Sequence, residues 1–192
     1  MTKQSPSQTV GPYFAYSLTP EDYGRKGIAS NRLAGLGQSD CIRIEGRVFD
    51  GVGDAVNDAM VEIWQANGAG RYAHPVDGRD DLPLTDGFTG FGRAMTDTNG
   101  GFWFETLKPG RVPGPGNQLQ APHIGIIVFS RGMQAHVFTR LYFSDEPSNS
   151  EDPVLESIDA KRRPTLIAEL SDGVYRFDIH LQGDHETVFF DA

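Results

Sequence analysis

The sequence predicts an all-β protein: a β-sandwich of two mainly antiparallel sheets with long loops, an extended N-terminal arm and one or two short helices. The chain has 23 glycines and 12 prolines in 192 residues, and its apolar runs are short. Frequent turn residues between short apolar segments are typical of sandwiches and barrels rather than of helical or alternating α/β chains. A chain of this length forms one domain. We expect an arm and linker over residues 1–40 and a sandwich domain over residues 41–192.

The N-terminal arm contains the sequence SQTVGPYFAYSL, which is rich in aromatic residues but has no period that would build a core. Aromatic side chains are costly to leave in water. We therefore expect the arm to dock on another surface.

Seven segments have the alternation, or the β-branched and aromatic content, of strands. In chain order they are CIRIEGRVFD, AMVEIWQA, GFWFETL, HIGIIVF, HVFTRLYF, VYRFDIHL and ETVFF, and the first begins at Cys41. The sequence DGVGDAVNDA joins the first two and predicts a turn, because Gly, Asp and Asn favour turn conformations. Trp64 and Trp103 lie within strand patterns, and we expect both in the core.

Two short helices are expected, at Asp152 to Ile158 and at Arg162 to Leu170. The first has an aspartate at the N-cap and a proline at the first helical position, an order that helices favour. The segment from Gly68 to Gly92 has no clear period and predicts a long loop. In a compact domain such a loop is usually functional or packed on a partner.

Composition excludes several classes of function. Acidic residues outnumber basic residues by 26 to 17, which gives a formal net charge of −9 and makes nucleic acid or an anionic membrane a poor partner. The single cysteine, Cys41, excludes an internal disulfide and a cysteine-rich zinc site, and it fits a reducing compartment. Neither a signal peptide nor a membrane-spanning run is visible, so we expect a cytoplasmic protein.

Three segments carry a specific pattern. They are VEIWQANGAGRYAH from Val61, GRAMTDTNGGFWFETLKPGRVPG from Gly92, and QAPHIG from Gln120. Together they resemble the intradiol ring-cleaving dioxygenases, which hold a non-haem ferric ion with two tyrosines and two histidines. The resemblance covers Cys41 to Phe190 and touches the arm. It implies a β-sandwich and a part in O2-dependent ring cleavage.

The residues at the four ligand positions depart from the family pattern. Tyr72 falls on the first tyrosine and His123 on the first histidine, whereas Val112 and Gly125 replace the second of each. Two histidines at i and i+2 of a strand would share one face and one metal, but here that face has one imidazole. Valine and glycine side chains offer no donor atom. We expect no catalytic iron at these vestigial ligand positions. Gln120 also replaces an arginine of the pattern.

Some family members are built from two homologous chains, of which one holds no iron. This chain resembles that iron-free chain in its two missing ligands, in its arm and in its C-terminal sequence. The resemblance implies a homologous iron-binding beta chain as partner, which holds Fe(3+) in a higher oligomer of alpha-beta units. It also implies cleavage of 3,4-dihydroxybenzoate by O2 to 3-carboxy-cis,cis-muconate, with no catalytic residue in this chain.

Arg131 is the candidate substrate-binding residue. It precedes Gly132 after a predicted strand, so it lies on a turn, where loops often carry function. A guanidinium binds a carboxylate through two parallel hydrogen bonds. The resemblance puts this arginine at the partner's substrate pocket, together with Thr9, Gly11 and Pro12 of the arm.

Other candidate residues have structural interpretations. Arg140 is expected to be a structural or interface charge, and the remaining histidines show no shared metal spacing: His74, His136, His180 and His185. Two alternatives stay open. The chain could be a stand-alone binding module on the same scaffold, which would be monodisperse alone, or an active iron enzyme with a substitute ligand such as His136 or Tyr142, which would be coloured.

Overall fold

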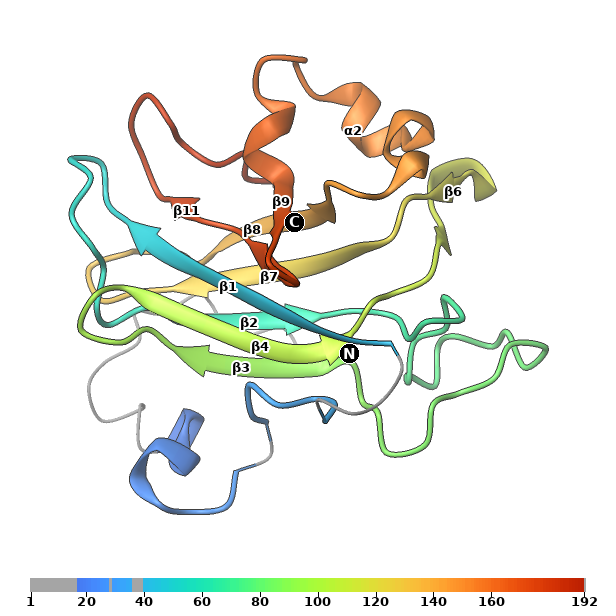
Figure 1. Ribbon diagram of the computed structural model, residues 1–192, viewed down its shortest axis with the longest axis horizontal. Helices are drawn as coiled ribbons and strands as arrows, with labels where there is room; N and C mark the ends of the chain where they lie inside the picture. The colour runs from blue at the N-terminus through green and yellow to red at the C-terminus, as the bar shows by residue number, and fades with distance from the viewer. Residues whose placement is uncertain (1–16, 28, 36–39, 192) are drawn as a thin grey trace.

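The computed structural model describes residues 17–27, 29–35 and 40–191, and it forms two layers of strands with most of the short helices at one end and one, Pro20–Tyr23, at the opposite end (Figure 1). The strands are β1 Cys41–Phe49, β2 Met60–Trp64, β3 Phe91–Met95, β4 Gly101–Leu107, β5 Val112–Pro113, β6 Leu119–Gln120, β7 His123–Phe129, β8 Val137–Phe143, β9 Ile167–Ser171, β10 Val174–Arg176 and β11 Ile179–His180. The helices are η1 Pro20–Tyr23, η2 Pro115–Asn117, η3 Pro147–Glu151, α2 Pro153–Ser157 and η4 Arg163–Leu166. None of the described helices is long and apolar enough to cross a membrane.

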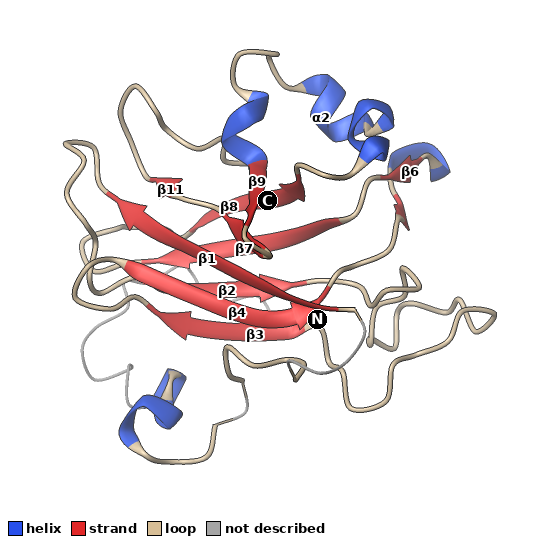
Figure 2. Cartoon of the chain, in the orientation of Figure 1, coloured by secondary structure: helices blue, strands red, loops and turns tan. Residues whose placement is uncertain are grey.

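One layer consists of β3, β2, β7 and β8, which pair in that order and are antiparallel throughout. The other contains β4 antiparallel to β1, with β10 and β11 parallel to β1. Strand β9 pairs with β10 of one layer and with β8 of the other, so the two layers are connected along one side. The predicted fold class, a sandwich of mainly antiparallel sheets with few helices, is confirmed (Figure 2).

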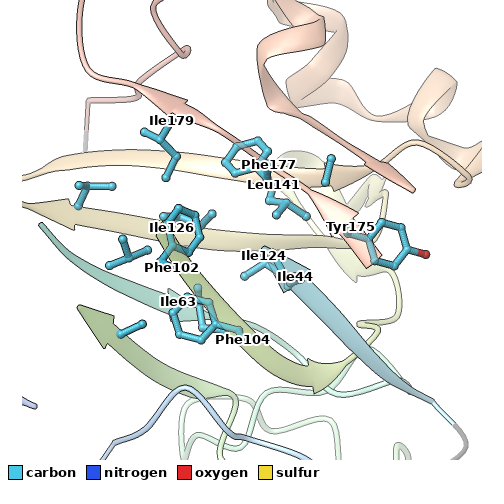
Figure 3. Close-up of a cluster of buried hydrophobic side chains, with 14 of the residues drawn as sticks. Ile44, Ile63, Phe102, Phe104, Ile124, Ile126, Leu141, Tyr175, Phe177 and Ile179 are labelled. Carbon is cyan, nitrogen blue, oxygen red and sulfur yellow. The ribbon is translucent and has the colours of Figure 1, made fainter. Parts of the chain in front are cut away.

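The core lies between the layers and is built from alternate residues of each strand. Ile44 and Val48 of β1, with Phe102 and Phe104 of β4, face Ile63 of β2 and its neighbours on β7 and β8. Figure 3 shows these side chains converging from both sheets. Each such side chain stabilises the fold by about 1.5–3 kcal/mol on burial.

Both tryptophans lie outside this core, so the prediction for them was wrong. Trp64 is 37% exposed, and Trp103 is partly exposed. Side chains alternate between the two faces of a strand. Because Ile63 points inward, Trp64 must point outward, and Phe102 and Phe104 force the same on Trp103. The Arg43 guanidinium lies over the Trp103 ring, with its central carbon 3.8 Å from the ring centroid.

Four strands were missed: the two-residue β5 and β6, and the longer β3 and β9, whose sequences lack strand character. Strand β3 has glycine and alanine at its inward positions; a side chain at Gly92 would meet Leu33, with its Cβ 2.5 Å from Cδ1. Strand β9 replaces the second half of the helix predicted from Arg162 to Leu170, and only the first half forms a helix, the short η4. Its pairing with both layers overrides the helical preference of its alanine, glutamate and leucine.

Other boundaries follow the sequence more closely. Asp152 caps α2 by accepting hydrogen bonds from the N–H groups of Val154 and Leu155, as predicted. The predicted long loop runs from the end of β2 to β3 without a helix or strand. The segment VYRFDIHL divides into β10 and β11, and ETVFF contributes only a single bridge, from Phe190 to Phe138.

The N-terminal arm, residues 1–16, lies outside the described residues, so its predicted docking stays a prediction. The described part of the linker follows the edge of the sandwich beneath β3 (Figure 1). The backbone N–H of Arg93 donates to the carbonyl of Ser30 at 3.0 Å, and that of Leu33 donates to Glu105 at 2.8 Å. This part of the linker is therefore fixed to its own domain.

Candidate functional site

The four vestigial ligand positions gather around the first half of β7. His123 and Gly125 lie on this strand, and Gly125 pairs with Trp64 at the end of β2. Tyr72, on the loop that follows β2, stacks on Trp64 with 5.7 Å between ring centroids. Val112 of β5 and Tyr72 line one cavity. The fold thus assembles the positions that the sequence pattern predicts.

The imidazole of His123 is buried, and its Nδ1 lies 2.8 Å from the carbonyl oxygen of Ala121. A carbonyl only accepts hydrogen bonds, so Nδ1 must carry the proton. Burial, assisted by the positive charge of Arg140, lowers the pKa of His123 to about 4. The ring is therefore neutral at physiological pH, and it satisfies a structural hydrogen bond.

Tyr72 is held by its ring and backbone. Its N–H donates to Asp77 at 2.8 Å, and Asp77 is paired with Arg79, which holds the pKa of that carboxyl well below its usual range. Burial raises the pKa of the Tyr72 phenol, against the opposing charges of Arg140 and Arg79. Its hydroxyl makes no hydrogen bond to another described residue. A protonated phenol is a poor metal ligand.

Val112 is 4% exposed and offers no donor atom. Gly125 leaves a gap on the same face as His123, and a Cβ built there would meet only the carbonyl oxygen of Trp64, at 3.3 Å. The family's ferric site requires two further donors here. The residues present therefore do not fit that ion. Within the described ranges no group of three or more His, Cys, Asp or Glu side chains is arranged to hold a metal.

A polar network passes behind these positions. Arg140 of β8 donates from Nη1 to the Gln120 side-chain oxygen at 2.6 Å, and the same Nη1 lies 3.4 Å from the Tyr142 hydroxyl. Tyr142 in turn donates to Asp152 at 3.3 Å. Asp152 is fully buried and also accepts from the backbone N–H of Ala121 at 2.7 Å. The network joins β6, β8 and α2 around the histidine.

Sequence reasoning missed the role of this network. Gln120 was noted as a lost arginine and Arg140 as a structural or interface charge, but nothing placed them together. They are 20 residues apart and meet only because β7 and β8 pair. Asp152 was recognised as a helix cap, not as the partner of Tyr142.

A cavity of about 490 Å³ opens beside Tyr72 and Val112. Its lining is largely aromatic and aliphatic, with one ion pair; it consists of Trp64, Tyr72, His74, Val76, Asp77, Arg79, Val112 and Pro113. Val76 is 86% exposed at its rim. The cavity thus borders two of the four vestigial ligand positions, Tyr72 and Val112.

The proposed substitute ligands do not complete a metal site. His136 packs between Phe129 and Phe138, at the opposite end of the β7–β8 pair from His123. Tyr142 lies 5.6 Å from His123 between ring centroids, but burial raises the pKa of its phenol well above the usual range. The other histidines do not complete a metal site either: His180 stacks on Phe49 and packs against His185, and His74 packs edge-on against Trp64.

Arg131 lies on the turn after β7, as predicted, and is 68% exposed. It lies six positions after Gly125, a distance of ~20 Å along extended backbone, so it belongs to a different place on the surface. Its Nε pairs with Asp58 at 2.9 Å, and Ser130 donates to the same carboxylate. Thr9, Gly11 and Pro12 lie outside the described residues.

Comparisons with known proteins agree with this geometry. A family model described as Dioxygenase matches residues 10–183. The chain is 46% identical to the protocatechuate 3,4-dioxygenase alpha chain of Burkholderia cepacia, over 99% of this chain and 98% of that one. It is 43% identical to the alpha chain of Pseudomonas putida, over 98% and 96%. It is 36% identical to the beta chain of Burkholderia cepacia, over 91% and 77%.

Solved structures agree at the level of the fold. Hydroxyquinol 1,2-dioxygenase from Pseudomonas putida DLL-E4 superposes with a TM-score of 0.62 at 19% identity, covering 93% of this chain and 68% of that one. A dioxygenase domain from Streptomyces sp. SirexAA-E gives 0.59 at 22% identity, covering 94% and 99%.

Proposed function

The chain belongs to the intradiol ring-cleavage dioxygenase family, and from this we propose that it is the iron-free alpha subunit of a protocatechuate 3,4-dioxygenase. The observation that carries the proposal is the pair of lost donors. Val112 and Gly125 stand where ferric ligands are required, yet the surrounding scaffold and the similarity to alpha chains are retained.

In this role the chain completes the active site of a homologous iron-binding beta chain. The similarity to a beta chain as well as to alpha chains supports a two-chain assembly. The reaction is the O2-dependent cleavage of 3,4-dihydroxybenzoate to 3-carboxy-cis,cis-muconate, and its metal chemistry belongs to the partner. This chain contributes walls, orientation and charge.

Arg131 is the residue to which we assign a contact with the substrate carboxylate. It is an exposed guanidinium on a turn, and its present partner, Asp58, is itself partly exposed. A substrate carboxylate can share or replace that contact when the partner chain covers the turn. Thr9, Gly11 and Pro12 of the arm are assigned to the same pocket, and residues 1–40 to docking on the partner.

Production of the full chain alone and together with an iron-binding beta chain tests the proposal. The chain alone should contain no stoichiometric iron and should take up no oxygen with 3,4-dihydroxybenzoate. Co-production should give a stable complex with iron in proportion to the beta chain, and protease should not cut the arm within that complex. Stoichiometric iron in the isolated chain, or a beta chain fully active by itself, would reject the proposal.

A further inference from the structure

The vestigial site has a positive charge beside it as well as lacking two donors. Arg140 lies directly opposite Gly125 in the antiparallel pairing of β7 and β8. Residues paired in this way have their side chains on the same face, close together. A side chain at position 125 would therefore lie beside the stem of Arg140.

The guanidinium is fixed in this place. It is partly buried, it donates to Gln120 at 2.6 Å, and it lies over the Phe190 ring at 5.7 Å from the centroid. The described residues place no carboxylate within ion-pair distance of it, so its charge is not neutralised by direct contact. That charge acts on Tyr72 and on His123, the two donors that remain.

We infer that the positive charge of the Arg140 guanidinium stands in for the charge of the metal. This fixed cation excludes iron from the vestigial site, even when all four donors are restored. The inference rests on the iron-free role proposed above and adds a second barrier to it. Like charges in a partly buried site repel strongly, and at an effective dielectric of about 20 this weakens binding of a cation on the order of 100-fold.

The test restores the donors with and without the arginine. The four-donor variant is Val112→Tyr with Gly125→His. Val112 borders the cavity, and a Cβ at Gly125 would meet only the Trp64 carbonyl oxygen, at 3.3 Å. Ferric affinity is measured in the full chain by competition with a chelator, and folding by circular dichroism. We expect the four-donor variant to bind ferric ion weakly. Once Arg140→Gln is added, binding should become about 100-fold tighter and stoichiometric, with a visible tyrosinate-to-iron absorption band.

Two controls separate charge from other effects. Arg140→Lys in the four-donor background keeps the cation and should leave binding weak. Arg176→Gln removes an arginine from the other layer, where it pairs with Glu45, and should also leave binding weak. If Arg176→Gln raises the ferric affinity as much as Arg140→Gln does, the effect comes from the net charge of the chain, and the inference is overturned.

Tight ferric binding by the four-donor variant with Arg140 intact would overturn the inference directly. Weak ferric binding after Arg140→Gln would overturn it as well. If the four-donor variant does not fold, Gly125→His alone provides the measurement: cobalt(II) should bind more tightly after Arg140→Gln, and unchanged affinity refutes the inference. Iron in the unaltered chain is a separate result that rejects the proposed function instead.

Discussion

The Nη1 of Arg140 lies 2.6 Å from the side-chain oxygen of Gln120, so a guanidinium reaches the position from which the family pattern has lost its arginine. The group comes from β8 instead of from the segment before β7. The positive charge is thereby carried by a residue directly opposite Gly125, one of the vestigial ligand positions.

The first prediction concerns Arg131 in the assembled enzyme. Arg131→Ala should leave iron content and assembly unchanged. It should weaken turnover of 3,4-dihydroxybenzoate by an amount that corresponds to about 2–5 kcal/mol of lost transition-state stabilisation, the cost of breaking a desolvated charge pair. Arg131→Lys should rescue only part, because an ammonium makes no planar double contact. Steady-state oxygen uptake measures the effect. Catechol, which has no carboxylate, is the control, and an equal loss with catechol means that Arg131 acts through structure.

The second prediction concerns Asp152. Asp152→Ala should lower the free energy of unfolding by roughly 3–4 kcal/mol, because it removes a helix cap, leaves the Ala121 N–H without a partner and leaves the Tyr142 hydroxyl without an acceptor. Asp152→Asn should cost less, since an amide oxygen still accepts. Urea unfolding of both variants measures this. A loss under about 1 kcal/mol for Asp152→Ala would contradict the importance given to the network.

The third prediction compares two glycines. A Cβ at Gly46 would lie 1.8 Å from the carbonyl oxygen of Phe177, which no rotamer change can relieve. Gly46→Ala should therefore destabilise the fold by about 3 kcal/mol or more, or prevent folding. Gly125→Ala meets only the Trp64 carbonyl oxygen at 3.3 Å and should change stability by less than about 1 kcal/mol. Thermal melting of the two variants measures the difference. Similar losses of stability in both would contradict the close approach of Gly46 to the Phe177 carbonyl.

The fourth prediction is a pH dependence of stability from His123. Its pKa is lowered to about 4 in the folded chain, so between that pH and the ordinary value of 6.5 the unfolded chain binds more protons. Stability should be fully present above pH 6.5 and fall as the pH drops toward 4, by up to roughly 3 kcal/mol. His123→Gln should remove this part of the slope. Denaturant melts across the range test it, and an unchanged slope would place the titration elsewhere.

The sequence alone determined which atoms are available. Side-chain identity at Val112 and Gly125 excludes two ligands wherever the strands lie, because neither residue has a donor. The strong alternation of β1, β7 and β8 and the cap at Asp152 are likewise local, so their elements were predicted correctly.

Only the tertiary structure decided which residues meet. Strand β9 forms because both layers offer it backbone partners, and β3 because Gly92 packs against Leu33. The outward direction of Trp64 follows from the burial of its neighbour. The meeting of Arg140 with Gln120 depends on the register of two strands, since that register, and not the spacing along the chain, brings a cation to the place where the iron ligands were lost.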